Sequence, residues 1–328
     1  WDIRNPIGLS PWVPTKEGGL PMNQPLHILA AGGDRRFSIL SRKLASIDGV
    51  RVTAFAQGSP ETASAAMPRV IDSLSELDTP PDLLILPLPL TRTGDTLSTP
   101  LEKERPPVYL GALLACCRPD IRIYGGMTPA AEEFAQLCQR HGLSFTDYLS
   151  DEAFALKNAD ATAEAAVALA IDLLPVTIRG TRILVTGGGR IARSLIRILC
   201  AMGAQVFAAA RSASQRCEMS LLGATVLPLT ELSRPAGSQG GILSTVRLVF
   251  NTIPSPVFGR EELVKMPADT LIVELASSPG GFKPEAVSSS GRVIVRALSL
   301  PGKTAPESCA EWLKTLICEK DPMLMTHL

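Results

Sequence analysis

The feature that most constrains this chain is a glycine-rich turn between an apolar strand and a helix. Residues 182–186 form a short apolar run, and the turn after it has the pattern Gly-x-Gly-x-x-Ala. Its residues are Gly187, Gly188, Gly189, Arg190, Ile191 and Ala192. In such a turn the first glycine permits a tight bend, the second lets the backbone approach a pyrophosphate, and the small last residue lets the helix pack on the strand. The helix N-terminus adds unpaired N–H groups and a positive dipole end.

The surroundings of this turn predict a Rossmann dinucleotide-binding unit. A helix is expected over 190–202 because Gly203 ends it, and a second strand follows at 205–209. The pattern alone is a weak signal, but the strand before it, the helix after it and the next strand all fit. The alternative is a glycine-rich turn that binds no ligand.

The end of the second strand indicates which dinucleotide is bound. An NAD-binding unit usually places Asp or Glu there to hold the ribose hydroxyls, whereas this chain has three alanines, Arg211 and Ser212. Arg211 could pair with a 2′-phosphate, and Ser212 could donate a hydrogen bond to it. NADP is therefore favoured over NAD. Alternatively, Arg211 is a solvated residue after a strand.

Strands alternate with helices before and after an apolar helix at 161–174, which predicts an α/β protein with two doubly wound parallel-sheet lobes and a cleft between them. Strands are expected at 26–31, 50–54, 83–86, 182–186, 205–209, 248–251, 271–274 and 292–295. The expected parts are a substrate-side domain (22–150), a linking helix (151–178), the NADP-binding domain (179–300) and a C-terminal helix packing back toward the first domain (301–328). Residues 1–21 are rich in Pro and Gly, so we expect an extension, with Met22 as the natural start.

Composition argues against several other classes of protein. The 328 residues hold 32 Lys plus Arg and 32 Asp plus Glu, so no basic excess favours nucleic acid or an acidic membrane. The longest apolar stretch, 161–174, is too short to span a bilayer and contains two acids. Seven cysteines without CxxC spacing and three histidines make a metal site unfavourable and favour reduced cysteines in the cytoplasm.

A series of short motifs extends along most of the chain. In order they are Gly32-Gly33-Asp34-Arg35, Thr93-Gly94-Asp95, Gly125-Gly126, Asn251-Thr252-Ile253-Pro254, Leu275-Ala276-Ser277-Ser278-Pro279-Gly280-Gly281 and Leu300-Pro301-Gly302-Lys303-Thr304-Ala305-Pro306. From Met22 to about residue 320 this series resembles the family of dipicolinate synthase A subunits. Its wider kin are the two-domain formate/glycerate-type dehydrogenases and adenosylhomocysteinase.

The resemblance implies oxidation of a dihydrodipicolinate-type ring, or its hydrated precursor, to dipicolinate, with NADP⁺ accepting hydride. It also implies that a flavoprotein-like B subunit is the partner and that the setting is the mother-cell cytoplasm of a sporulating bacterium; a homo-oligomer is expected. The chain departs from the family pattern Asn-x-x-Pro-Thr-x-Glu-Gly. Asn158, Thr162 and Glu164 match it, while Ala161 and Ala165 replace Pro and Gly. We expect this change to alter the helix start and the substrate loop.

Candidate site residues follow from these motifs. No histidine is well placed as a base, so the catalytic candidates are Glu164, at an expected helix start, Asp34 and Thr162. A dicarboxylate needs cations and donors, which predicts a substrate set of Arg35, Arg92, Thr93, Gly94, Asn158 and Lys303. Beside the glycine-rich turn, Arg211 and Ser212, the cofactor set includes Asn251, Thr252, Ile253, Pro254, Ala276 and Ser277. The plainer alternatives are a first-turn glutamate, a capping aspartate and solvated surface charges.

Two other functions fit the same sequence. One is an NADP-dependent dehydrogenase of another small acid, although no catalytic His–Glu or Lys–Asp pair is recognisable. The other is a non-catalytic NADP-binding subunit whose partner performs the chemistry.

Overall fold

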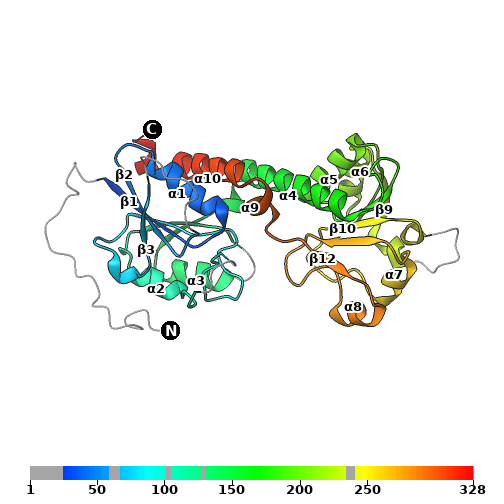
Figure 1. The fold of residues 1–328 in the computed structure, drawn as a ribbon, viewed down its shortest axis with the longest axis horizontal. Helices are drawn as coiled ribbons and strands as arrows, with labels where there is room; N and C mark the ends of the chain where they lie inside the picture. Colours follow the sequence, from blue (N-terminus) through cyan, green and yellow to red (C-terminus); the bar gives the residue numbers. More distant parts are fainter. Residues whose placement is uncertain (1–24, 59–66, 101–104, 128–130, 234–240, 328) are drawn as a thin grey trace. The chain divides into compact units, whose positions relative to one another are not determined.

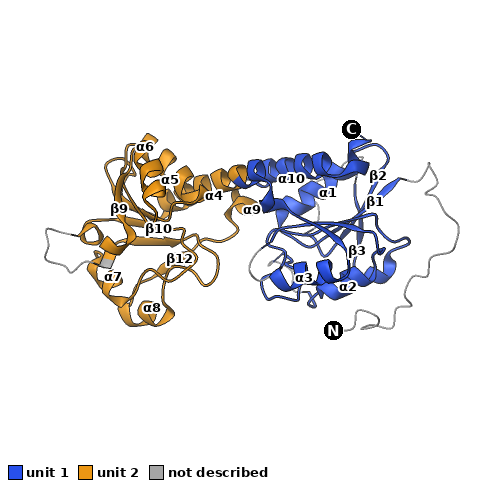
Figure 2. Cartoon of the chain, turned by 180° about the vertical axis from the view of Figure 1, so that it is seen from behind, with its two compact units in different colours: residues 1–155, 305–328 blue, residues 156–304 orange. Residues whose placement is uncertain are grey.

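The chain forms two compact α/β units in a computed structural model that describes residues 25–58, 67–100, 105–127, 131–233 and 241–327. Unit 1 comprises 1–155 and 305–328, and unit 2 comprises 156–304 (Figure 2). The chain therefore leaves unit 1, builds unit 2 and returns to unit 1. The expected extension, 1–21, lies outside the described residues.

Unit 1 is built on a parallel sheet of six strands, in the order β3-β2-β1-β4-β5-β6. The strands are β1 (Leu26–Ala31), β2 (Val50–Phe55), β3 (Arg69–Ile71), β4 (Leu83–Ile85), β5 (Arg122–Gly125) and β6 (Ser144–Asp147). All six residues of β1 are buried, as expected of a central strand covered on both faces. Strand order reverses beside β1, which makes the gap between β1 and β4 the switch point of this sheet.

Helices cover both faces of this sheet. They are α1 (Arg35–Ala45), α2 (Leu110–Ala115), α3 (Glu132–Arg140), α10 (Pro306–Lys320) and α11 (Pro322–Met325). Figure 1 shows α1 and α10 on one face, and α2 and α3 on the other. Leu40, Leu313 and Ile317 belong to the core cluster of the first face, and Leu113 and Phe134 to that of the second.

The C-terminal region contains three helices, α9 (Leu300–Thr304), α10 and α11, where one was expected. The first of them, α9, is a separate short helix and belongs to unit 2. Pro306 then starts α10, since proline has no N–H to donate and its fixed φ suits the first turn of a helix.

Unit 2 repeats the architecture with the order β12-β11-β10-β7-β8-β9, again all parallel. Its strands are β7 (Arg182–Thr186), β8 (Gln205–Ala210), β9 (Thr225–Pro228), β10 (Leu248–Asn251), β11 (Leu271–Glu274) and β12 (Ile294–Arg296). Its shorter helices are α5 (Arg190–Ala201), α6 (Ala213–Leu221), α7 (Arg260–Lys265) and α8 (Pro284–Ser290). The switch point lies between β7 and β10. The expected α/β class with two doubly wound parallel sheets is thus confirmed.

The helix α4 (Glu152–Leu173) begins nine residues before the expected apolar stretch. The Oδ1 of Asp151 accepts a hydrogen bond from the Phe154 N–H at 3.0 Å and so caps this earlier start. The helix then runs through Ala161 and Ala165 without a break, because alanine favours a helix interior where Pro and Gly oppose it. The predicted helix start beside Thr162 is therefore wrong.

Candidate functional site

The glycine-rich turn joins β7 to α5 at the edge where the carboxyl ends of the unit 2 strands meet. Gly187 has φ +104°, and its N–H donates to the Ala209 carbonyl on β8 at 2.9 Å. A Cβ at this position would overlap the Thr252 hydroxyl. Glycine is therefore required here by backbone conformation and by space, as the motif predicts.

Gly189 and Gly188 are glycine for different reasons. Gly189 caps α5 in an extended conformation, and a Cβ built on it would meet nothing within 4 Å. Ala192, one turn later, is fully buried. The open side of Gly189 thus faces free space at a helix N-terminus, where a pyrophosphate is bound in Rossmann units. A Cβ on Gly188 would instead lie 2.7 Å from the Gln215 side chain, so Gly188 makes room for α6.

The end of β8 carries no carboxylate. Ala208, Ala209 and Ala210 are buried, whereas Arg211 and Ser212 are exposed, and the Ser212 side chain makes no capping hydrogen bond to α6. The sequence reasoning missed Arg216, whose Nη1 donates to the Ala210 carbonyl at 2.9 Å and to the Arg211 carbonyl at 2.6 Å. Arg216 could have been found from the sequence, because it lies in the first turn of the helix that follows Arg211 at the end of β8.

A buried polar network links the carboxyl ends of β7, β10 and β11. The Thr186 hydroxyl donates to Asn251 Oδ1 at 2.6 Å, and Asn251 Nδ2 donates to Glu274 Oε1 at 2.7 Å. Thr186 and Asn251 are fully buried, and Glu274 is 3% exposed. The three side chains therefore cross three adjacent strands in a single chain of hydrogen bonds.

The same network fixes the two loops that follow β10 and β11. Asn251 Nδ2 donates to the Ile253 carbonyl at 3.0 Å, and the Ile253 N–H lies 3.3 Å from Asn251 Oδ1. Glu274 accepts from the Ala276 N–H at 2.9 Å and the Gly281 N–H at 2.7 Å. Of the predicted cofactor residues, Asn251, Ile253 and Ala276 are thus brought together. Glu274 was missed, although a lone charge within an otherwise apolar strand is a detectable signal.

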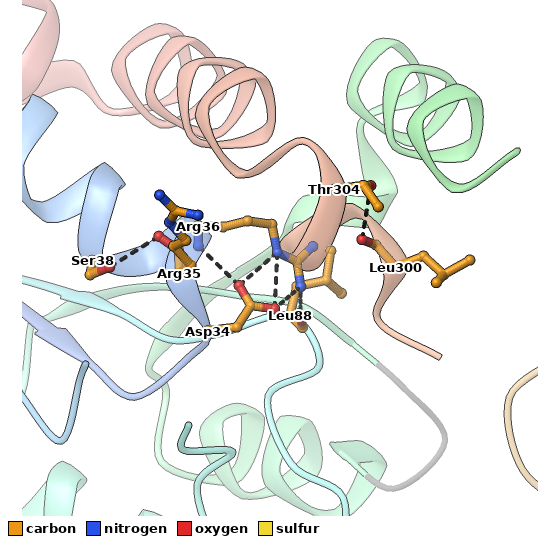
Figure 3. Close-up of polar contacts among 7 residues, drawn as sticks. All are labelled: Asp34, Arg35, Arg36, Ser38, Leu88, Leu300 and Thr304. Atoms are coloured by element: carbon orange, nitrogen blue, oxygen red, sulfur yellow. Dashed lines mark hydrogen bonds and ion pairs between the residues drawn. The ribbon is translucent and has the colours of Figure 1, made fainter. Parts of the chain in front are cut away.

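In unit 1, Asp34 caps α1 and is held by Arg36 (Figure 3). Arg36 Nε donates to Asp34 Oδ1 at 2.9 Å, and Nη2 donates to Asp34 Oδ2 at 2.8 Å and to the Leu88 carbonyl at 2.6 Å. The Arg36 side chain is 3% exposed and that of Asp34 29%. These contacts favour a role for Asp34 in capping α1 and orienting a buried guanidinium.

The other unit 1 candidates lie on the surface. Arg35, Arg92 and Thr93 are exposed. The sequence predicted the Gly94 N–H as a donor to the substrate. In the structure this N–H donates to Thr91 Oγ1 at 3.0 Å within its own loop. Thr91 is itself buried, so the turn is held from inside.

The remaining candidates lie in unit 2, on α4 and α9. Asn158 and Thr162 are joined within α4, where the Thr162 hydroxyl donates to the Asn158 carbonyl at 2.7 Å. Glu164 is exposed in the middle of this helix, and Lys303 is exposed on α9. Glu164 therefore lacks the helix-start environment on which its selection depended.

The described residues carry neither a metal centre nor a membrane-spanning helix. No group of three or more His, Cys, Asp or Glu is gathered there in a way that could hold a metal ion. Within the same ranges, no helix has both the length and the apolar character needed to cross a bilayer.

Comparisons with known proteins agree with this architecture. Residues 27–149 match the family of the N-terminal domain of the dipicolinate synthase A subunit. The A subunit of dipicolinate synthase from Bacillus subtilis (strain 168) is 28% identical over 240 residues, which cover 72% of this chain and 76% of the relative. The crystal structure of the same subunit from Bacillus halodurans has a TM-score of 0.80 at 23% identity, covering 93% of this chain and 99% of that one. The D-lactate dehydrogenase of Escherichia coli has a TM-score of 0.59 at 11% identity, covering 90% and 96%.

The fold defines the class first: a two-unit α/β protein with two parallel six-stranded sheets, an architecture shared with the dehydrogenase structure just described. Within that class the chain is similar to the dipicolinate synthase A subunit, and residues 27–149 match the N-terminal domain of that family. The resemblance expected from the motifs is confirmed.

Proposed function

We propose that this chain is an NADP-dependent oxidoreductase subunit that converts dihydrodipicolinate, or its hydrated precursor, to dipicolinate. The observation that carries the proposal is the open side of Gly189 at the N-terminus of α5, in a relative of the dipicolinate synthase A subunit. The absence of a carboxylate at 208–212, with Arg211 and Ser212 exposed there, favours NADP over NAD.

The reaction removes a hydride and a proton from the substrate ring. A bound nicotinamide supplies the acceptor for the hydride, and the proton passes to a base, with aromatisation of the ring favouring the products. Because both oxygens of Asp34 accept from Arg36, we assign the proton to Glu164, with Thr162 and Asn158 on the same helix. Arg35, Arg92, Thr93 and Lys303 are the proposed partners of the two substrate carboxylates.

The proposed assembly follows from the relationship to dipicolinate synthase. A flavoprotein-like B subunit is the proposed partner, and the chain itself is proposed to form a homo-oligomer. The proposed setting is the mother-cell cytoplasm of a sporulating bacterium, where dipicolinate is needed for the endospore. The division of roles into a substrate-side unit 1 and a cofactor-binding unit 2 belongs to the same proposal.

Calorimetric titration with NADP⁺ and NAD⁺ tests the cofactor. We expect tighter binding of NADP⁺, and Arg211→Asp should weaken it by about 10- to 100-fold while leaving NAD⁺ affinity nearly unchanged. Arg197→Asp is a matched control, since Arg197 on α5 is paired with Asp160 at 2.9 Å. Equal loss of both cofactors in Arg211→Asp would contradict the 2′-phosphate assignment, and binding of neither by the wild type would overturn the cofactor site.

Activity is tested with freshly prepared dihydrodipicolinate and NADP⁺, by following reduced nicotinamide and dipicolinate together. Equimolar formation of the two by the isolated chain would support the proposal. Formation only after a B subunit is added would show that this chain is an incomplete enzyme. Binding of NADP⁺ without turnover in either mixture would overturn the proposed reaction.

A further inference from the structure

Glu274 is a buried carboxylate without a cationic partner among the described residues. It ends β11 with 3% of its surface exposed. Its oxygens accept three hydrogen bonds, from Asn251 Nδ2 at 2.7 Å, the Ala276 N–H at 2.9 Å and the Gly281 N–H at 2.7 Å. All three donors are neutral, so the negative charge is solvated by the protein but is not neutralised.

The contacts also fix the position of both oxygens of this side chain. Each Glu274 oxygen accepts a hydrogen bond from at least one N–H donor. Space around it is equally restricted, because a Cβ on Gly280 would lie 2.9 Å from Glu274 Oε2. The network thus holds the carboxylate group in one place at the end of β11.

The position of Glu274 in the sheet places its charge on the side where the nicotinamide half of a dinucleotide would bind. Such ligands lie across the carboxyl ends of the strands at the switch point, here between β7 and β10. The glycine-rich turn, with its helix N-terminus for the pyrophosphate, leads from β7 toward β8. β10 and β11 form the opposite half of the sheet, which in a Rossmann unit receives the nicotinamide.

We propose that Glu274 is a fixed counter-charge that makes the site prefer the oxidised, positively charged nicotinamide over the reduced, neutral one. This inference rests on the proposed nicotinamide cofactor. The two forms share their adenine, riboses and phosphates, so contacts with those groups cancel in the ratio of the two affinities. What remains is the extra positive charge of the oxidised ring, which a buried anion attracts more strongly than it would in water. This preference favours binding of the oxidised cofactor, which accepts the hydride, and promotes release of the reduced cofactor.

The test is the ratio of the dissociation constants for the reduced and oxidised forms of NADP, measured by calorimetry. Glu274→Gln should lower this ratio by about tenfold, as expected for removal of a unit charge in partly screened surroundings. Glu274→Asp keeps the charge and should keep the ratio, even if both affinities fall. Thr186→Val removes the hydrogen bond to Asn251 but no charge, so it should change both affinities by one factor.

A second pair of variants avoids disturbing the core. Ser277 is exposed on the loop that Glu274 anchors, so charges can be added there without loss of folding. Ser277→Lys should lower the ratio and Ser277→Glu should raise it. An unchanged ratio in this pair, or equal weakening of both forms by Glu274→Gln, would show that Glu274 only holds the loops and would overturn the counter-charge. Failure of the wild-type chain to bind either form would overturn the proposed function and the counter-charge together.

Discussion

At the scale of single residues, Gly187 and Gly189 have different roles in the turn: Gly187 is needed for folding, and Gly189 is proposed to be needed for cofactor binding. Gly187→Ala places a Cβ against Thr252 in a left-handed backbone conformation, so we expect a loss of about 1–3 kcal/mol of stability. Gly189→Ala meets no protein atom, so its melting temperature should stay near that of the wild type. Its methyl group would occupy the space proposed for a pyrophosphate, and cofactor affinity should fall at least tenfold. Thermal melts and titrations of both variants check this, and wild-type affinity in Gly189→Ala would contradict the proposed cofactor position.

At the scale of elements, β1 carries a buried histidine, His27, that makes the free energy of unfolding depend on pH. His27 Nε2 lies 2.9 Å from Thr53 Oγ1, and Nδ1 lies 3.2 Å from Thr79 Oγ1. Burial, and then the positive charge of Arg51, lower the pKa of His27 below its ordinary value of 6.5. The folded state therefore binds this proton less readily than the unfolded state. Its stabilising contribution is complete above pH 6.5 and is lost as the pH falls below that value toward the lowered pKa.

Urea unfolding followed at a series of pH values checks this dependence. Between pH 6.5 and about 5, the midpoint of unit 1 should fall more steeply for the wild type than for His27→Asn, which cannot take up the proton. Parallel slopes would mean that other groups cause the acid sensitivity. His141→Asn is a matched control, because His141 lies exposed at the end of α3.

Elements also show how far sequence reasoning extends. Long apolar strands such as β1 and β7 were predicted with their bounds, because burial on both faces leaves an uninterrupted apolar run. β3, β6 and β9 were missed, since each has four residues or fewer and most of them are partly exposed. The linking helix expected from residue 151 begins at Glu152. Only the helix start assigned to Glu164 was wrong, because the apolar stretch was used as a boundary although Asp151 was an available capping signal.

The candidate site was predictable where backbone conformation requires glycine and unpredictable where distant side chains meet. Gly187 could be recognised from local spacing alone. The contact of Arg36 with Leu88 joins residues 52 positions apart, and the hydrogen bond between Asn251 and Glu274 spans 23. Such pairings depend on strand order and register, which the motif pattern of one sequence does not define.

At the scale of the whole molecule, the last 24 residues complete the unit that the first half of the chain begins. Asp321, fully buried after α10, lies 3.1 Å from Arg122 Nε as an ion pair and accepts from the Tyr124 hydroxyl at 3.2 Å. Burial and the charge of Asp321 raise the pKa of Tyr124, so this hydroxyl keeps its proton. Oδ1 of Asp321 also caps α11 through Met323 and Leu324.

Asp321→Ala should therefore lower the stability of unit 1 by about 3 kcal/mol, because it leaves a cation and a buried hydroxyl on β5 without their partner. Asp321→Asn, which keeps the acceptor for the α11 cap, should cost less. Unit 2 contains none of these contacts, so cofactor affinity should be unchanged in both variants. Calorimetric melting with and without cofactor separates the two units, because the cofactor should raise only the melting temperature of unit 2. The Asp321 variants should lower only the melting temperature of the other transition. A shift of the cofactor-sensitive transition by the same amount would mean that the two units unfold together, and that the C-terminal segment stabilises the chain as one cooperative body.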